Sequence, residues 1–461
     1  MGERASWRIR WRLSVLWALE WGITGAILTY LPLYFTENDR LTREQLSQLM
    51  AVSAVGLWVA PLVVGQICDR WLATEKYLAI AHFVGGLALV AIPIATDMYE
   101  KTGENFAALV AIVGLYAVCY FPTVPLATSL TFRHLPDPDS QFGRIRIWGT
   151  VGWVLAGLSL SLWLGRSEAY AWLVERYPQW AGGLAEFRAA FSWLGPPTSS
   201  DCFRIAAMLS FALSSFCVFL PATPPSRSDR GAVAPLHTLA MFRDRTFALL
   251  IAITFLLALV VPFYSLAVPM LLKQMGFQEK WVPAVMTIGQ ISEFPALLLV
   301  AYCLKRYGLK AIFAMGMAAW LVRYVFFAFE SPTWLVLSGI ALHGVCHVFL
   351  IIVIQLYVDR QCRSDLRASA QNLFAFLTMG IAMPLGFLLS GWLLELLTPA
   401  DVFGETVKHT DYTSFFAVPA AFILLLLIAF GRWFRLEESN GESPGPSPAV
   451  EYAKQAVGSG K

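Results

Sequence analysis

Long apolar stretches recur along the chain, and short polar segments separate them. A helix that crosses a membrane needs about 20 mostly apolar residues, because the bilayer core offers its backbone groups no partner outside the helix. By this criterion the sequence predicts about twelve spans in two sets of six. The first six are expected at 13–35, 45–66, 76–96, 105–131, 146–165 and 203–221. The second six are expected at 246–272, 281–303, 309–329, 333–357, 367–396 and 413–433.

Three polar segments interrupt or follow this pattern. Residues 223–245 form a linker, so we expect an N-terminal half over 1–222 and a C-terminal half over 246–435. Residues 166–201 form a long extracellular connection, in which Trp and Phe favour a helix lying at the membrane interface. Residues 436–461 are rich in Gly, Ser, Pro and Glu, a composition typical of a disordered tail.

Composition agrees with an integral membrane protein. Of the 461 residues, 57% are hydrophobic and 14% are charged, whereas soluble domains carry about 25% charged residues. The net charge of +3 gives no indication of nucleic-acid binding. The seven cysteines lack the spacing of a metal site or a disulfide framework. The first apolar stretch is too long for a signal peptide and is interpreted as a retained span.

The distribution of Lys and Arg predicts the orientation in the membrane. With the N-terminus inside, roughly 23 of the 34 basic residues fall on cytoplasmic segments, as the positive-inside rule requires. We therefore expect both termini in the cytoplasm.

Two loops carry similar motifs at matching places in the two halves. The string "GQICDRWLATEK" (65–76) follows the second span and resembles the G-x-x-x-D-R signature of the major facilitator superfamily. The string "LKRYGLK" (304–310) follows the eighth span and resembles the degenerate second copy of that signature. Each alone could be an ordinary basic loop, but together with six plus six spans they imply an all-α transporter of two repeats. The motif residues assigned to conformational gating are Gly65, Asp69, Arg70, Lys305 and Arg306.

Acidic residues inside spans are costly in a membrane and usually functional. Glu293 lies near the middle of the eighth span, and Gln290 lies one turn away on the same face. Desolvation favours the protonated carboxyl group, which suits a site that loads and releases a proton. A permanently neutral carboxyl group, or one paired with a neighbour such as Arg323, is the alternative. Glu20, about two turns inside the first span, could carry protons, contact substrate or face a wet vestibule.

Histidines also lie inside spans. His343 and His347 are four residues apart on one face of the tenth span. They could bind substrate, carry protons or form hydrogen bonds between helices. A metal site is not predicted, because no third ligand is evident in the sequence. His82 in the third span is interpreted as structural.

Several strings resemble the nucleoside–proton symporter family, which lies within the major facilitator superfamily. In order along nearly the whole chain they are "AIAHFVGG" (79–86), "YFPT" (120–123), "RIRIWGTVGW" (144–153), "QISE" (290–293), "AWLVRYVFFAF" (319–329) and "LRASAQNLF" (366–374). The resemblance implies import of nucleosides across a bacterial inner membrane, driven by a proton gradient and requiring no cofactor. It also implies one central site for a small solute between the halves. We expect a monomer in the lipid bilayer, without a nucleic-acid partner.

The resemblance assigns roles to particular residues. Arg146 and Thr150 match positions that line the nucleoside site, and Trp153 falls where the family has an aromatic residue. Arg144 is then the anchor at the membrane face, whereas Arg146 turns inward. The residues predicted to bind substrate are Arg146, Thr150, Trp153, Tyr264, Gln290, Glu293, His343 and His347. The residues predicted to couple protons are Glu293, Glu20 and His347.

The sequence departs from the family in two spans. In the seventh span the family has amide side chains, whereas "VVPFYSLAVP" offers Tyr264 as its only large side chain with a polar tip. In the tenth span His347 and Val348 stand where the family has an aromatic residue and an aspartate. These changes leave the proton coupling and the nucleoside specificity open.

Two other functions remain as alternatives. The same fold could carry another polar solute, such as a sugar or sugar derivative, by facilitated diffusion. A non-transporting sensor is a more remote alternative. Enzymatic activity is not expected, because the sequence contains no nucleophile–base arrangement, phosphate-binding loop or metal constellation.

Overall fold

The computed structural model describes most of the chain. The described residues are 6–37, 40–59, 64, 67–68, 71–190, 192, 195–225, 245–361, 373–398 and 409–434. Within them every regular element is a helix and no strand occurs, which confirms the all-α prediction.

Ten helical segments of the described chain are long and apolar enough to cross a membrane. One of them, Glu279–Ala328, contains both the eighth and the ninth predicted spans, so the ten segments account for eleven of the twelve predictions. The second predicted span, 45–66, is described only in part, as α3 (Arg43–Val52) and α4 (Ala54–Val59).

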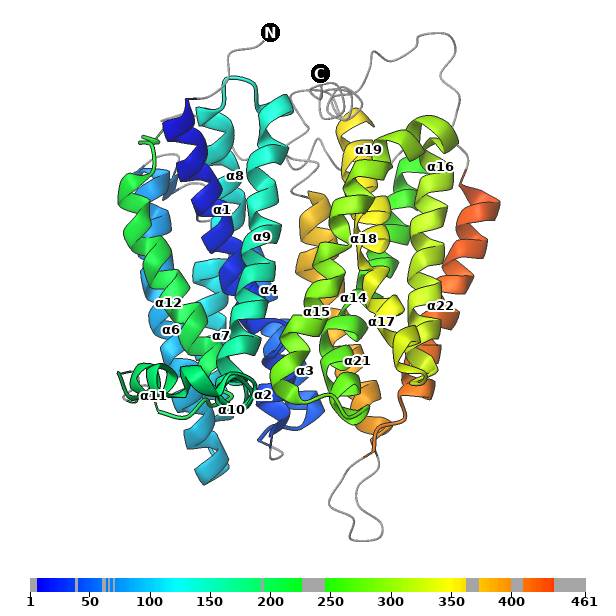
Figure 1. Ribbon diagram of the computed structural model, residues 1–461. Coiled ribbons are helices and arrows are strands. Elements are labelled where there is room, and N and C mark those ends of the chain that lie inside the picture. The colour runs from blue at the N-terminus through cyan, green and yellow to red at the C-terminus, as the bar shows by residue number, and fades with distance from the viewer. Residues whose placement is uncertain are drawn as a thin grey trace.

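The helices form two bundles that stand side by side (Figure 1). The N-terminal bundle also contains α1 (Trp7–Ile27), α2 (Leu31–Thr36), α6 (Thr74–Thr102), α7 (Phe106–Tyr120), α8 (Thr123–His134), α9 (Pro138–Leu164), α12 (Asp201–Phe216) and the short η5 (Cys217–Phe219). The C-terminal bundle contains α14 (Arg245–Gln274), η7 (Glu279–Trp281), α15 (Val282–Ile291), α16 (Glu293–Ala328), α17 (Thr333–Ala341), α18 (His343–Cys346), the π-helix η8 (His347–Ile352), α19 (Val353–Gln361), the π-helix η9 (Phe376–Ala382), α21 (Met383–Leu396) and α22 (Tyr412–Trp433).

Breaks in the long helices have identifiable causes. Between α7 and α8 stands Pro122, whose ring cannot donate a backbone hydrogen bond. Within α16 the chain turns at Gly308, where φ is 75°, a conformation that side chains other than glycine rarely adopt. This turn separates the eighth span from the ninth.

Glycines allow α1 and α9 to approach closely. A Cβ atom on Gly25 would lie 2.6 Å from the backbone oxygen of Trp153, and one on Gly152 would collide with the backbone of Ala18. Small residues are the usual means of bringing membrane helices together. The contact fixes the rotation of α9 and thereby directs Arg146 toward α1.

The two halves meet through α9 against α15 and through α3 against α21. The hydroxyl of Ser161 accepts the backbone N–H of Ala284 at 2.9 Å, and Glu395 accepts the N–H of Arg43 at 3.0 Å. Helix α3 lies toward the lower end of the molecule in Figure 1, so its contact with α21 joins the two halves at that end.

The connection 166–201 contains helices over residues 166–190, in line with the predicted helix. It contains α10 (Arg166–Arg176), η3 (Pro178–Trp180) and α11 (Ala181–Ala190). Both α10 and α11 lie at the lower end of the N-terminal bundle, and α11 lies across its axis (Figure 1). Trp172 and Trp180 are exposed. The position of this segment at a membrane interface stays a prediction.

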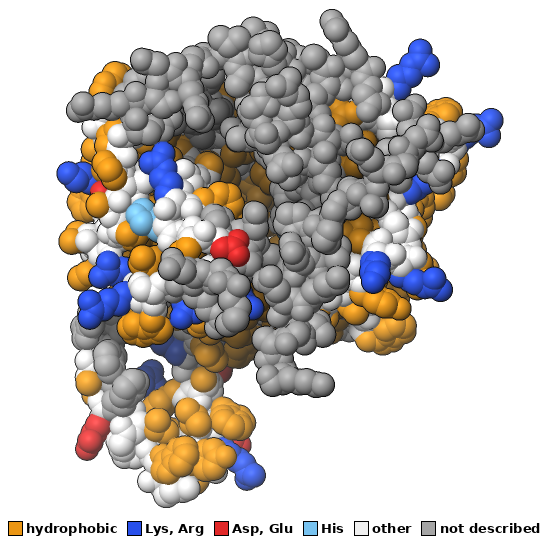
Figure 2. Space-filling model, turned by 90° about the horizontal axis from the view of Figure 1, so that it is seen from above, with side chains coloured by type: hydrophobic (Ala, Val, Ile, Leu, Met, Phe, Trp, Pro, Cys, Tyr) orange, Lys and Arg blue, Asp and Glu red, His pale blue; other side chains and the backbone are white. Residues whose placement is uncertain are grey.

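Several predictions fall on the remaining parts of the chain. Gly65, Asp69 and Arg70, most of the linker 223–245 and the tail 436–461 lie outside the described residues. Lys305 and Arg306 are exposed on α16, before the turn. On the upper face, where α1 begins and α22 ends, the charged side chains drawn are mainly Lys and Arg (Figures 1 and 2).

Candidate functional site

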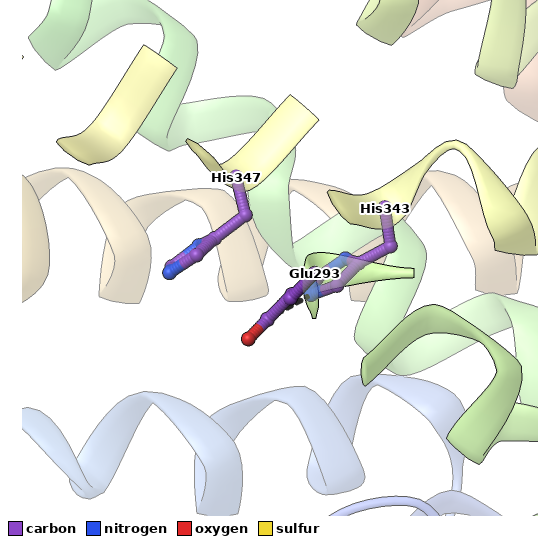
Figure 3. A group of neighbouring side chains, drawn as sticks. All are labelled: Glu293, His343 and His347. Carbon is purple, nitrogen blue, oxygen red and sulfur yellow. Dashed lines mark ion pairs between the residues drawn. The ribbon is translucent and has the colours of Figure 1, made fainter. Parts of the chain in front are cut away.

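Three ionisable side chains converge in the C-terminal half. Glu293 begins α16, His343 begins α18 and His347 begins η8 (Figure 3). A close contact of the backbone brings them together, because the N–H of Gly344 donates to the hydroxyl of Ser292 at 2.8 Å. Any side chain at Gly344 would collide with the backbone of Ser292.

These three side chains are half-buried. Nε2 of His343 lies 3.4 Å from Oε1 of Glu293, and both side chains keep 16–18% of their surface exposed. The rings of His343 and His347 stack at 5.8 Å between centroids. The carboxyl group of Glu293 is therefore accessible to a ligand while remaining in contact with His343.

A buried arginine fixes the state of His343. Arg323 is fully buried in α16, and its Nη1 lies 3.3 Å from Nδ1 of His343. A guanidinium group can only donate, so Nδ1 must accept and the ring proton must sit on Nε2, facing Glu293. The adjacent positive charge also disfavours a doubly protonated ring. His343 is thus neutral, with its N–H on the nitrogen nearer to Glu293, and Tyr264 lies under the guanidinium at 3.5 Å.

Glu293 lies close enough to His343 and His347 to be a third potential metal ligand, which the sequence alone does not show. The candidate ligand atoms of Glu293, His343 and His347 all lie within 4.8 Å of one another. A metal-bound histidine normally donates its other N–H to a carboxylate or carbonyl group. In this structure Nδ1 of His343 accepts from Arg323 and cannot donate in this way. The surroundings of His343 therefore fit a neutral hydrogen-bonding ring better than a metal ligand.

Arg146 turns into the protein from the opposite half, whereas Arg144 is exposed. Its guanidinium lies over the rings of Trp21 at 4.4 Å and Trp17 at 4.9 Å on α1. A Cβ atom on Gly149 would lie 2.5 Å from Nη1 of Arg146, so this glycine provides the space. Arg146 interacts electrostatically with Glu293 of the C-terminal half.

Two predicted ligand-binding side chains leave buried polar atoms without a hydrogen-bond partner among the described residues. They are Nε1 of Trp153, on α9, and Oε1 of Gln290, on α15. These two helices pack against each other between the halves. Buried polar groups are nearly always hydrogen-bonded, so such atoms are available to a bound polar ligand.

The remaining predicted residues differ in their position. Thr150 is half-buried on α9. Tyr264 packs between Arg323 and the ring of His343, and its hydroxyl faces Sδ of Met286 at 3.9 Å. Its ring therefore helps to position His343, and its hydroxyl is directed toward α15.

Glu20 does not join this group of side chains. It is fully buried among helices of the N-terminal half, beside His82, so it does not face a wet vestibule in this structure. His82, which the sequence indicates only as structural, is its partner at 2.9 Å.

The sequence reasoning did not identify Trp17 and Trp21 as neighbours of Arg146. Their spacing of four residues, which places them on one helical face, was the available signal.

Comparison with known proteins identifies the family to which this chain belongs. The model of the nucleoside H+ symporter family matches residues 7–174 and 183–439. The chain belongs to the nucleoside–proton symporter family. This membership spans both halves and every described residue of the candidate site, and it confirms that the protein is a membrane transporter.

Two relatives of this symporter family member cover almost its whole length. YegT of Escherichia coli strain K12 is 29% identical over 431 residues, which cover 91% of this chain and 93% of YegT. The nucleoside permease NupG of the same organism is 24% identical over 448 residues, or 93% of this chain and 96% of NupG. The crystal structure of NupG matches the fold with a TM-score of 0.74 at 22% identity, covering 93% of this chain and 100% of that one.

Proposed function

We propose that this symporter family member imports nucleosides together with protons by alternating access, in a bacterial inner membrane. The proposal is carried by the electrostatic interaction of Arg146 with Glu293, which belong to opposite halves, together with the unpartnered polar atoms of Trp153 on α9 and Gln290 on α15. A ligand held by all four groups would touch both halves at once, as alternating access requires.

The chemistry of these groups suits a nucleoside. The rings of Trp21 and Trp153 lie 5.8 Å apart on the N-terminal side and offer faces for a flat base. Gln290 and the indole N–H of Trp153 can bond to ring nitrogens or ribose hydroxyls. Arg146 and Thr150 can do the same from α9, and His347 lies beside Glu293 as a further polar ring.

Proton coupling in this proposal depends on the charge of Glu293. While ionised, it attracts Arg146 across the interface and lies 3.4 Å from the Nε2 of His343. A proton on Glu293 removes that attraction, so the halves can rearrange with the ligand. Because Arg323 keeps His343 neutral, the transported proton is expected on Glu293 and not on this histidine.

The proposed orientation places the upper end of Figure 1 in the cytoplasm. The Lys and Arg side chains drawn on that face and the positive-inside rule support it. The contacts of α3 with α21 then join the two halves at the outer side. Gly65, Asp69, Arg70, Lys305 and Arg306 would act in the cytoplasmic gate.

A second candidate is another polar solute, such as a sugar. The position of Tyr264 favours it, because this side chain packs beneath Arg323 where the family has amides that read the nucleoside.

The test is uptake of labelled uridine and adenosine by proteoliposomes, with and without an inward proton gradient. Accumulation that depends on the gradient supports the proposal. Uptake that only equilibrates contradicts proton coupling. If neither compound is transported and a sugar raises the Tm of the protein, the second candidate replaces the first.

A further inference from the structure

A sealed acid–base pair lies inside the N-terminal half. Glu20 on α1 is completely buried, and its Oε2 lies 2.9 Å from Nε2 of His82 on α6, which is 1% exposed. The hydroxyl of Thr123, the first residue of α8, donates to Oε1 at 2.5 Å. Three helices therefore meet at one carboxyl group.

Among the described residues, His82 is the only basic side chain within ion-pairing distance of this carboxyl group. Three further groups interact with it electrostatically. They are Tyr116 and Tyr120 of α7 and Cys217 of η5, which follows α12.

The pair can therefore exist in two states that differ by one proton. A carboxylate that accepts the hydroxyl of Thr123 and lies against a neutral His82 keeps its negative charge, which is costly in a membrane interior. Uptake of one proton neutralises the pair, whichever of the two side chains carries it. No Arg or Lys of the described residues forms an ion pair with it, so a change of environment can shift the equilibrium.

Tyr120 connects the pair to Arg146. Its phenol donates to the backbone carbonyl of Glu20 at 2.7 Å, so the hydroxyl of Thr24, 2.5 Å away, must donate to the phenol oxygen. The same phenol lies in the neighbourhood of Arg146 of α9. Tyr120 ends α7, and Thr123 begins α8 after the break at Pro122.

We propose that Glu20 and His82 form a proton-binding site, separate from the substrate site, that loads and empties during transport. The inference rests on the proposed function for its role in coupling. Protonation changes the contact of Glu20 with His82 and reverses its hydrogen bond with Thr123, whose hydroxyl also lies 2.5 Å from the backbone oxygen of Tyr120 at the end of α7. The break between α7 and α8 therefore responds to the proton. Tyr120 then moves relative to Arg146, which links proton occupancy to ligand affinity.

The first test needs no nucleoside. Infrared difference spectra of the full-length protein, recorded over a pH titration, report protonation of buried carboxyl groups. We expect a titrating carboxyl band that disappears in Glu20→Gln and persists in the control Glu75→Gln. Glu75 lies on the same helix as His82 but accepts the backbone N–H of Thr223. An unchanged band in Glu20→Gln overturns the proposal.

The second test measures coupling. We expect Glu20→Gln to lower gradient-driven uridine accumulation at least about tenfold, while exchange of uridine stays within about twofold of wild type. Wild-type accumulation overturns the role in transport. If the wild type transports no nucleoside at all, the proposed function fails, and loss of the infrared band still identifies the proton site.

A second variant covers the case in which Glu20→Gln does not fold. His82→Gln keeps an N–H donor toward Glu20 but cannot take up a proton. We expect the pH midpoint of the carboxyl band to shift in this variant. An unshifted midpoint overturns the assignment of the pair.

Discussion

Two buried polar clusters occupy corresponding spans of the two halves, and they differ in charge and in access. In the N-terminal half, the first, third and fourth spans meet at Glu20, an acid sealed beside His82. In the C-terminal half, the first, third and fourth spans meet at Arg323, which orients His343 toward the partly exposed Glu293.

The difference follows from the chemistry of the central group. A carboxyl group beside a histidine can gain or lose a proton, so the N-terminal cluster can store one. A guanidinium group stays charged, so Arg323 itself stores no proton and instead orients His343 toward Glu293. The N-terminal half therefore holds the proposed sealed proton site, Glu20 with His82, and the C-terminal half holds Glu293, an oriented acid that a ligand can reach.

The largest expected effect is that of Glu293→Gln. The variant cannot lose a proton, so uridine accumulation driven by a proton gradient should fall to the level of equilibration. Exchange of uridine should persist in part. The measurement is uptake by proteoliposomes, with Glu186→Gln on the exposed α11 as control. Full accumulation by Glu293→Gln would contradict the assignment of the accessible acid.

Arg146→Ala should have the next largest effect. The guanidinium stacks on two Trp rings and faces Glu293 across the interface, so its loss should weaken ligand binding about 10- to 100-fold. Titration calorimetry measures this, and Arg144→Ala is the matched control because Arg144 is exposed two residues away. Equal affinities of the two variants for the ligand would indicate that Arg146 is an anchor at the membrane face and does not bind the ligand.

Substitutions of His343 should separate a donor from a metal ligand. His343→Gln can accept from Arg323 and donate to Glu293, so we expect it to retain most transport, whereas His343→Leu should lose about tenfold. Treatment with a chelator should leave wild-type uptake unchanged. Inhibition by the chelator and restoration by Zn²⁺ would instead favour the metal site.

The smallest effect is expected at the ion pair of Glu168 with Lys280, which joins α10 to η7 of the other half at 2.6 Å. The hydrogen bond from Lys280 lowers the pKa of Glu168 below its ordinary value. The stabilisation is therefore present above that ordinary pKa and is lost as the pH falls through the lowered one. Thermal unfolding of wild type and Glu168→Gln should differ slightly near neutral pH and converge in acid. A difference that grows in acid would contradict this.

Sequence alone located the spans because the need for apolar residues in hydrocarbon is a local property. It also indicated the family, through strings such as "RIRIWGTVGW", and it placed Arg146 inside and Arg144 outside by that resemblance. The pairing of His343 with His347 was visible for a similar reason, since a spacing of four residues defines one helical face.

Only the tertiary structure decided which of these polar groups meet. The pairing of Glu20 with His82, and the insertion of His343 between Arg323 and Glu293, join residues of different helices. Helices that are apolar on every side carry no amphipathic signal for their rotation. Their rotation depends on close contacts at small residues such as Gly152 and Gly344, which become apparent only when the helices are packed together.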